Sequence, residues 1–321
     1  MTAADVVDAV LEAPVVTSFT RLGYAVRSRV EGWRPLWDYD LRGRTVAITG
    51  PTSGIGEAAA GWYARLGADL ILIARNEEKV ASLAARLEEE TGNTTISSVT
   101  ADLGDLESVR AAGARIAETH DRLDVLVHNA GSLFNERRTQ PDGTETTVAV
   151  QVIGPFLLTG LLLDRIAPGG RVLTMSSGGM YAVPLTVTGL EMDEESYRGA
   201  TQYAIAKRAQ VTLNEMWAEK VPAVHFHAFH PGWADTPGVE GSLPGFRRVV
   251  GPLLRSAHQA ADTMVWLSAD DGPPLATTGG FWLDRRIRDI HKLARTRRSD
   301  TAERRSALWD LVSAKAEWSL P

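Results

Sequence analysis

The chain has 321 residues, of which 44% are hydrophobic and 23% charged, and its formal net charge is −6 at pH 7. This balance is typical of a soluble globular protein with a substantial core. The absence of cysteine excludes disulfides, thiolate metal sites and a cysteine nucleophile. No apolar run approaches the roughly 18 residues that span a bilayer, and the acidic first 13 residues do not resemble a secretory signal. We therefore expect a cytoplasmic protein.

Residues 1–43 precede the first predicted strand and are predicted to form an N-terminal helical extension. Apolar residues recur there at helical spacing, which predicts one amphipathic helix: Val15, Phe19, Leu22, Val26 and Val30. We expect this helix to dock on its own domain. Peripheral contact with a membrane surface is the less favoured interpretation.

Short apolar runs alternate with amphipathic segments along the middle of the chain. They predict helices at 55–66 and 77–90, and strands at 45–49, 70–74, 96–101, 123–128, 171–176 and 224–230. Continuous apolar strands separated by helices predict the α/β class, with a doubly wound parallel sheet covered by helices on both faces.

A glycine-rich turn joins the first predicted strand to the first predicted helix. Gly50 is placed for the tight turn, Gly54 for close approach of the backbone to a pyrophosphate, and Gly56 for helix packing. The helix N-terminus also presents free N–H groups and a positive dipole end to phosphates. We expect a dinucleotide to bind at Gly50, Ser53, Gly54, Ile55 and Gly56.

The end of the second predicted strand distinguishes between two dinucleotides. Arg75 and Asn76 follow Ala74 there, where NAD binding commonly uses a carboxylate to accept the ribose hydroxyls. A guanidinium suits a 2′-phosphate, so NADP(H) is favoured over NAD(H). Two further turns are expected to contact the cofactor: Asp102-Leu103 at the adenine, and Asn129-Ala130-Gly131 where the cofactor crosses the sheet.

Tyr203 and Lys207 stand four residues apart on a predicted helix, so the phenol and the ammonium share one face. A nearby cation favours phenolate and lowers the pKa of a phenol from its ordinary value of roughly 10. Tyr203 is therefore expected to donate or accept a proton near neutral pH. For the pair taken alone, an ordinary contact on a helix surface is an equally good interpretation.

Taken together, these motifs resemble the short-chain dehydrogenase/reductase family. The matching pieces occur in family order over about 190 residues: Thr49-Gly50-x-x-x-Gly54-Ile55-Gly56, Asp102-Leu103, Asn129-Ala130-Gly131, Ser176-Ser177, Tyr203-x-x-x-Lys207 and Pro231-Gly232-x-x-x-Thr236. Arg75-Asn76 is similar to the retinol-dehydrogenase-like branch. The runs Ser176–Met180, His230–Gly238 and Ala261–Trp266 are similar to the orphan dehydrogenase/reductase member-twelve branch.

The resemblance implies an NADP(H)-dependent oxidoreductase on a single Rossmann-type sheet, which interconverts a carbonyl and an alcohol by hydride transfer. Tyr203 would be the general acid/base, Lys207 would lower its pKa and hold the nicotinamide ribose, and Ser177 would bind the substrate oxygen. Three residues of the last motif would fix the nicotinamide carboxamide: Pro231, Gly232 and Thr236. The dinucleotide-binding domain would then cover residues 44–284, with a substrate lid at 178–202 and 237–258, followed by a basic helical tail at 285–321.

Gln151 departs from the family pattern. The family usually has Asn at this position, which shapes a helix bulge and anchors a proton-relay water to the catalytic lysine. Gln151 keeps the carboxamide but adds a methylene. A catalytically weak or inactive NADPH-binding module or sensor is therefore the alternative to an enzyme, although the intact Ser177, Tyr203 and Lys207 favour the enzyme.

The expected substrate is an apolar carbonyl or alcohol, because four residues are predicted near the mouth of the site: Met180, Tyr181, Trp233 and Phe246. Ordinary packing of a lid is the alternative interpretation of the same residues. His225, His227 and His230 are expected to pack in a central strand, so no metal is predicted. The family tendency also suggests a homo-oligomer.

The tail concentrates positive charge, with nine Lys or Arg from Arg285 to Arg305 against three acidic residues. A solvated helix face around Leu293, Leu308 and Leu311 is the favoured interpretation. No aromatic platform interleaves with these charges, so no nucleic-acid partner is predicted.

Overall fold

Eight strands form one sheet in the order β3-β2-β1-β4-β5-β6-β7-β8, in a computed structural model that describes residues 2–237, 241 and 244–320. The strands are β1 Thr45–Thr49, β2 Asp69–Ala74, β3 Ile96–Thr100, β4 Leu123–His128, β5 Ile166–Met175, β6 His225–Phe229, β7 Phe281–Leu283 and β8 Arg286–Ile287. All pairs are parallel except β7 with β8. The order reverses between β1 and β4, so the predicted doubly wound α/β sheet is confirmed.

The inner strands of the sheet are largely buried on both faces, which explains their continuous apolar sequences, whereas the edge strands β3 and β8 are largely half-buried or exposed. In β2, Leu70 and Leu72 belong to the core on one face, whereas Ile71 and Ile73 belong to the core on the other. This alternation follows from the two-residue period of a strand. Both faces must therefore carry a layer of helices.

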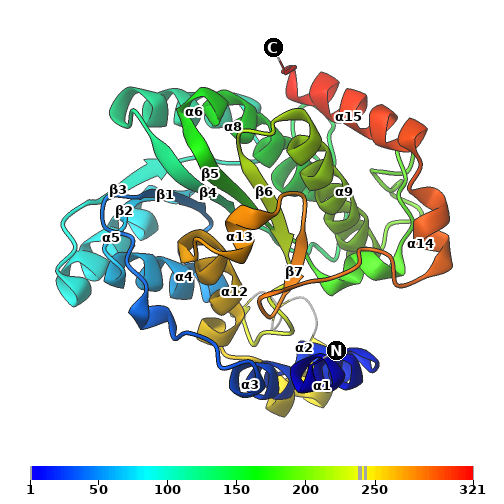
Figure 1. The fold of residues 1–321 in the computed structure, drawn as a ribbon. Helices are drawn as coiled ribbons and strands as arrows, with labels where there is room; N and C mark the ends of the chain where they lie inside the picture. The colour runs from blue at the N-terminus through cyan, green and yellow to red at the C-terminus, as the bar shows by residue number, and fades with distance from the viewer. Residues whose placement is uncertain (1, 238–240, 242–243, 321) are drawn as a thin grey trace.

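Two helical layers cover the sheet (Figure 1). One layer consists of α4 Gly54–Arg65, α5 Glu77–Thr91 and α12 Ala257–Ala269, and the other of α6 Leu106–Thr119, α8 Gly154–Leu162 and α9 Gly199–Lys220. Among the described residues, the remaining helices of four or more residues are α11 Pro244–Val250, α13 Pro273–Ala276, α14 Ala294–Ser299, α15 Ala302–Ala316 and three in the N-terminal extension.

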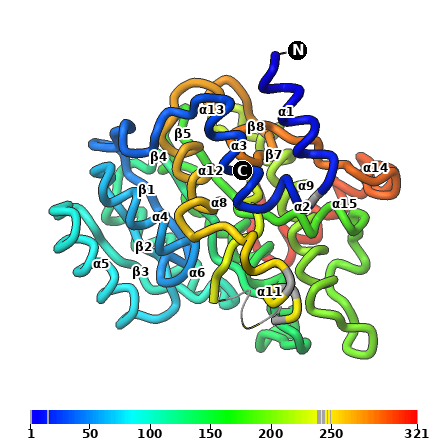
Figure 2. Tube along the Cα trace, turned by 90° about the horizontal axis from the view of Figure 1, so that it is seen from below, coloured from blue at the N-terminus to red at the C-terminus, as the bar shows by residue number. Residues whose placement is uncertain are grey.

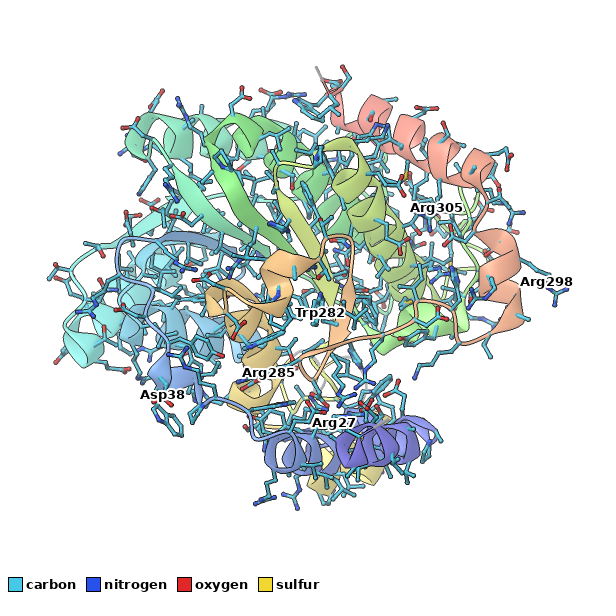
Figure 3. The ribbon with its side chains drawn as sticks, viewed as in Figure 1. Arg27, Asp38, Trp282, Arg285, Arg298 and Arg305 are labelled. Carbon is cyan, nitrogen blue, oxygen red and sulfur yellow. The ribbon has the colours of Figure 1, made fainter. Side chains whose placement is uncertain are left out.

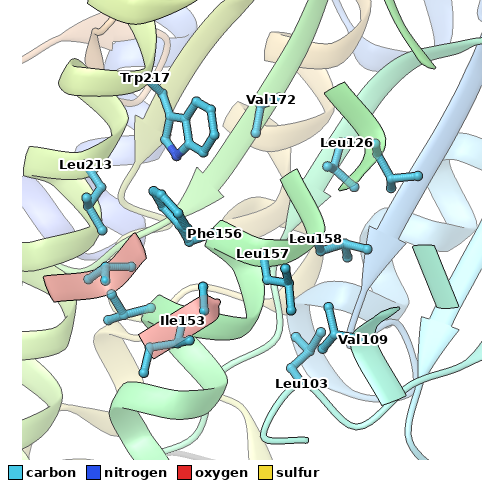
Figure 4. Packing of buried hydrophobic residues seen from close by; sticks show 14 of the residues in the cluster. Leu103, Val109, Leu126, Ile153, Phe156, Leu157, Leu158, Val172, Leu213 and Trp217 are labelled. Carbon is cyan, nitrogen blue, oxygen red and sulfur yellow. The ribbon is translucent and has the colours of Figure 1, made fainter. Parts of the chain in front are cut away.

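The larger core lies between the sheet and the layer of α6, α8 and α9. Phe156 of α8 packs there with Leu213 and Trp217 of α9 (Figure 4). Helix α15 closes this core from outside, where Trp309 places its ring 4.9 Å from both Phe156 and Trp217. The tail is therefore part of the core around the helix that carries Tyr203 and Lys207.

A continuous helical segment, Thr146–Arg165, runs from α7 Thr146–Val148 through α8. By length and composition it is apolar enough to cross a membrane, which revises the expectation that no run approaches that length. In the protein, 72% of its apolar window is buried, as in a core helix. Residues Ala149–Ile153 form a π-helical turn inside it.

The N-terminal extension contains three helices, α1 Ala3–Glu12, α2 Val15–Phe19 and α3 Arg21–Val30. The prediction of one amphipathic helix is wrong, because Thr20 is extended (φ −88°, ψ 173°) and separates α2 from α3. Of the predicted stripe, Phe19 is buried, but Leu22 and Val30 are 49% and 45% exposed. Figures 1 and 2 show the three helices gathered beside β7 and β8.

The basic tail is largely neutralised within the chain, so the prediction of a solvated basic face is wrong for most of its charges. Six of its nine cations form ion pairs: Arg285 with Asp262, Arg286 with Glu31, Arg288 with Asp8, Lys292 with Glu12, Arg297 with Asp289 and Arg305 with Asp300. Leu308 is fully buried. The predicted domain boundary at 284/285 falls in the turn of the β7–β8 hairpin.

Candidate active site

A cleft of about 320 Å³ opens at the carboxyl ends of β1 and β4, where the strand order reverses. Open α/β sheets bind ligands at this switch point. Its walls come from five turns that follow strands: Gly50–Gly56, Ile73–Arg75, Ala101–Leu103, Asn129–Ser132 and Thr236–Pro237. Most of the predicted cofactor residues therefore meet in one place.

The glycine turn has the geometry predicted for a phosphate site. Gly50 and Gly54 have φ of +64° and +58°, the left-handed region that favours glycine. A Cβ on Gly56 would lie 2.2 Å from the carbonyl oxygen of Gly50, so only glycine lets α4 start this close to the turn. Ser53, the N-cap, makes no side-chain capping bond, which leaves the first N–H groups of α4 directed at the cleft.

Asn129 holds this turn closed, a role that its sequence position did not predict. Its Nδ2 donates to the carbonyl oxygens of Thr49 and Gly50, each at 2.9 Å. In return the Thr49 hydroxyl accepts from the backbone N–H groups of Asn129 and Ala130, both at 3.1 Å. The β4 turn and the glycine turn are thus one rigid unit.

Arg75, at the end of β2, is exposed and lines the cleft. Asn76 does not line it, because its Oδ1 accepts from the backbone N–H of Lys79 at 2.8 Å and caps α5. Asp102 lines the cleft beside Leu103, and its Oδ1 accepts from the backbone N–H of Gly104 at 2.9 Å. The predicted contact of the Asn76 side chain with the cofactor is therefore not supported.

The two adjacent serines at the end of β5 have different partners. The Ser176 hydroxyl donates to the backbone oxygen of Lys207 at 3.0 Å and so anchors α9. The Ser177 hydroxyl accepts from the backbone N–H of Gly179 at 3.2 Å, and it lies near enough to the Tyr203 phenol to lower the pKa of that group. The second serine is therefore the one that faces the tyrosine.

The expected lowering of the Tyr203 pKa is wrong for this structure. Burial raises the pKa of Tyr203 to about 12, although the neighbouring Ser177 hydroxyl opposes the rise. Lys207 Nζ lies 5.3 Å from the Tyr203 ring centroid and donates to the backbone oxygen of Met175 at 2.8 Å. Burial lowers the pKa of Lys207 to about 7, so this lysine, rather than the tyrosine, titrates near neutral pH.

Gln151 lies in the π-helical turn behind Lys207, so the helix bulge is present with glutamine at this position. Its Nε2 donates to the backbone oxygen of Ser132 at 2.7 Å. A Cβ on Gly131 would lie 3.1 Å from Gln151 Oε1 and 3.5 Å from Lys207 Nζ, so both polar atoms approach the same glycine. The longer amide therefore still reaches the neighbourhood of the lysine.

Gln210 is a polar residue of the site that sequence reasoning missed. Its Nε2 donates to the backbone oxygen of Gln151 at 2.6 Å, a carbonyl in the π-helical turn. Gln210 is 5% exposed, and it stands three residues after Lys207 and seven after Tyr203, on the same face of α9. A polar residue at that spacing on a core-facing helix was the available signal.

The residues predicted to contact substrate separate into two groups. Met180 and Tyr181 are buried in a core with Phe281, and the Tyr181 hydroxyl donates to the backbone oxygen of Asp289 at 3.0 Å. The alternative of lid packing is therefore correct for both. Trp233 is half-buried and belongs to the Pro231–Thr236 loop. The side chain of Phe246 lies outside the described residues.

The histidines of β6 form packing contacts. Trp282 Nε1 donates to His227 Nδ1 at 3.0 Å, so His227 Nε2 carries the proton that it donates to the Pro274 carbonyl oxygen at 2.8 Å. The His230 ring packs edge-on against Phe19 with 4.4 Å between centroids. Among the described residues, no group of three or more His, Asp or Glu is placed to hold a metal ion.

The family model described as short chain dehydrogenase matches residues 44–243. The chain belongs to the short chain dehydrogenase family. It is therefore an oxidoreductase enzyme of the Rossmann type, as its motifs predicted.

Two human relatives support the predicted branches of this family. Dehydrogenase/reductase SDR family member 12 from Homo sapiens is 36% identical to this dehydrogenase over 268 residues, covering 83% of this chain and 84% of the relative. Retinol dehydrogenase 13 from Homo sapiens is 32% identical over 258 residues, covering 76% of this chain and 77% of the relative. The predicted resemblance to both branches is confirmed.

A solved structure shares the fold. A short chain dehydrogenase from Escherichia coli CFT073, complexed with NADPH, is 26% identical to this dehydrogenase with a TM-score of 0.61. The match covers all of that protein (100%) but 78% of this chain. This dehydrogenase therefore carries segments beyond the shared fold.

Proposed function

We propose that this dehydrogenase interconverts a carbonyl and an alcohol, with NADP(H) as the hydride carrier. The observation that carries the proposal is the Ser177 hydroxyl near the Tyr203 phenol, with Lys207 buried on the same face of α9. The nicotinamide ring supplies or accepts the hydride when the cofactor is bound. The protein contributes orientation and one proton, and the described side chains suit both tasks.

The residues around the cleft fit a phosphorylated dinucleotide. The turn at Gly50–Gly56 offers unpaired backbone N–H groups and excludes side chains where a pyrophosphate would lie. The adenosine end would meet Arg75, Asp102 and Leu103, which line the cleft. At the other end the nicotinamide would be held by Asn129, Ala130, Gly131, Pro231, Gly232 and Thr236.

The proton would come from Tyr203 in the reducing direction. With a pKa of about 12, the phenol is protonated at neutral pH, as a general acid must be. Ser177 would orient the substrate oxygen toward that phenol. Lys207, with a pKa of about 7, would exchange the proton that Tyr203 loses, and Gln151 reaches toward it from behind.

NADP(H) is the proposed cofactor because Arg75 stands where a 2′-phosphate would lie. The NADPH in the Escherichia coli relative supports this choice. Fluorescence titration is the test: Arg75→Ala should lower the affinity for NADPH about ten-fold or more and leave the affinity for NADH unchanged. Arg115→Ala, on the exposed side of α6, is the matched control. Equal affinity of the wild type for NADPH and NADH would contradict the proposal.

An apolar substrate is proposed because Trp233, a residue of the Pro231–Thr236 loop, is half-buried and Phe134 lines the cleft. The name of the retinol dehydrogenase relative indicates that a relative acts on an apolar alcohol. The substrate would then be a small molecule with a hydrophobic body next to its carbonyl. Polar carbonyl compounds should be reduced more slowly than apolar ones of equal size.

The decisive experiment follows NADPH absorbance with a panel of aldehydes and ketones. Tyr203→Phe should lower kcat by about 10²- to 10⁴-fold, the usual contribution of a positioned acid. Tyr197→Phe is the matched control, because its hydroxyl bonds Glu145 at 3.1 Å, away from Ser177. Turnover that survives in Tyr203→Phe would remove Tyr203 from the mechanism. NADPH binding without turnover of any carbonyl would favour the alternative, an NADPH-binding module or sensor.

A further inference from the structure

The segment Ser18–Thr20 consists of the last two residues of α2 and the residue that joins it to α3, and it packs against the loop Pro231–Thr236. The family match begins at residue 44 and includes the loop but not the segment. We propose that the N-terminal extension is a working part of the cofactor site, because Phe19 holds the Pro231–Thr236 loop in the position that binds the nicotinamide half of NADP(H). This inference rests on the proposed function, which assigns that loop to the nicotinamide.

The backbone of the loop is paired with the extension on one side and with Arg255 on the other. The Trp233 N–H donates to the Phe19 carbonyl oxygen at 2.7 Å. The Arg255 N–H donates to the Trp233 carbonyl oxygen at 2.7 Å, and the Asp235 N–H donates to the Arg255 carbonyl oxygen at 2.9 Å. Residues 233–235 thus have strand-like partners on both sides, and one partner belongs to the extension.

The Phe19 ring reaches both halves of the proposed active site. It is 3% exposed, and it meets the His230 ring edge-on, immediately before the loop. A Cβ on Gly178 would lie 2.4 Å from Phe19 Cε2, so the ring also packs against the residue after Ser177. One aromatic side chain of the extension therefore buttresses the catalytic serine turn and the nicotinamide loop together.

The side chain of Arg255 joins the segment to the loop through hydrogen bonds. The guanidinium donates to the carbonyl oxygens of Ser18 at 3.0 Å, Phe19 at 3.1 Å and Pro231 at 3.3 Å. Gly232 has φ +79°, and a Cβ there would lie 2.3 Å from Arg255 Nε, so the loop can approach the guanidinium only because this residue is glycine. The loop and the segment thus share one buried cation.

A second buried arginine, Arg27 of the extension, joins the same network of hydrogen bonds. Asp284 accepts from Arg255 at 2.5 and 2.8 Å and from Arg27 at 2.7 Å, and all three side chains are 1% exposed. Arg27 Nη1 also donates to the Ser18 carbonyl oxygen at 3.0 Å. Figure 3 shows Arg27 between the N-terminal helices and the β7–β8 hairpin. Breaking a buried charge network of this kind is costly, so the segment has little freedom to leave the loop.

Asp284 has φ +54°, although it is not glycine. A side chain in this region strains the backbone, and such strain persists only where the surroundings over-determine the conformation. Here the strained turn places one carboxylate between two guanidiniums. The hairpin, the extension and the loop are therefore joined at a single point.

The contact predicts an effect on one half of the cofactor. The Pro231–Thr236 loop would meet the nicotinamide, whereas the Gly50–Gly56 turn and Arg75 would meet the adenosine and its phosphates. The segment contacts the loop and Gly178. Loosening the segment should therefore weaken the binding of NADPH. The ligand 2′,5′-ADP lacks the nicotinamide half, so it should bind as before.

The test compares these two ligands on the full-length protein. Phe19→Ala should raise the Kd of NADPH about ten-fold and leave the Kd of 2′,5′-ADP within about two-fold of the wild type. Leu22→Ala, on the exposed side of the same extension, should leave both values unchanged. An equal loss for both ligands would reduce Phe19 to a general stability role, and an unchanged NADPH Kd would overturn the proposal.

Hydrogen exchange on the wild type tests the same coupling without a substitution, should Phe19→Ala fail to fold. NADPH should slow amide exchange in peptides that cover residues 14–24, and 2′,5′-ADP should not. Exchange that is equally slow with either ligand, or unaffected by NADPH, would overturn the inference. A wild type that binds neither ligand would overturn the proposed function as well. A protein that binds NADPH but reduces no carbonyl would leave the binding comparison valid.

Discussion

Replacing Lys207 with methionine should abolish catalysis and yet change stability in a direction that depends on pH. Burial lowers the pKa of this lysine from its ordinary 10.5 to about 7. Between these values the unfolded chain binds a proton that the folded protein does not, so the free energy of unfolding falls by about 1.4 kcal/mol for each pH unit on the way down. At and below pH 7 the buried lysine therefore lowers the free energy of unfolding of the wild type by about 5 kcal/mol, and above pH 10.5 this destabilisation is absent.

Methionine has a similar size and does not titrate, so this destabilisation disappears in Lys207→Met. The substitution also removes the bond from Nζ to the Met175 carbonyl oxygen, a loss of about 1 to 3 kcal/mol at every pH. The variant should therefore be more stable than the wild type at pH 7 by a few kcal/mol. From pH 7 to pH 9.5 this advantage should shrink by about 3 kcal/mol.

Urea unfolding at pH 7.0, 8.0, 9.0 and 9.5 measures this difference directly. The range stops below the ordinary pKa of tyrosine, so Tyr203 keeps its proton throughout. Lys79→Met, an exposed lysine, is the control and should shift stability by the same small amount at each pH. A Lys207→Met difference that does not change with pH would refute the argument that burial holds this lysine near its titration point.

Three further predictions follow from the site. Gly56→Ala should abolish NADPH binding measured by fluorescence, since its Cβ would lie 2.2 Å from the Gly50 carbonyl oxygen, and a variant that binds normally would contradict the role of this glycine. Gln210→Leu should lower the free energy of urea unfolding by about 1 to 3 kcal/mol and reduce kcat, because it removes the hydrogen bond to the Gln151 carbonyl oxygen in the π-helical turn; unchanged values for both would show that this bond is dispensable. Burial lowers the pKa of His128 to about 3, so the wild type should lose stability as pH falls from 6.5 toward 3; in His128→Asn the loss over that range should be smaller, and parallel acid-unfolding curves would contradict this.

The sequence by itself predicted the parts of the site that lie within short stretches of chain. The strand, the glycine turn and the helix after it are contiguous, so the chemistry of Gly50, Gly54 and Gly56 can be deduced from spacing alone. Tyr203 and Lys207 share a helix face because of the helical period. The alternation of strands and helices, and with it the α/β class, followed from the same local periodicities.

The tertiary structure decided the questions that depend on residues far apart in the chain. It distinguished Ser177 from Ser176, because only the fold shows which hydroxyl faces Tyr203. It also reversed the expected pKa of that tyrosine, since burial raises this pKa and Lys207 Nζ lies over the ring, 5.3 Å from its centroid. Periodicity carries no information on either point.

The N-terminal extension shows the same limit most clearly. Its apolar stripe predicted one helix, but Thr20 is extended and Phe19 packs against His230, and the hydrogen bond from Arg255 to the Phe19 carbonyl oxygen spans 236 residues of sequence. The sequence indicated that an apolar segment was present before the first strand. Only long-range packing and a buried ion-pair network, formed between segments that meet when the chain folds, determined that it contacts the proposed nicotinamide loop.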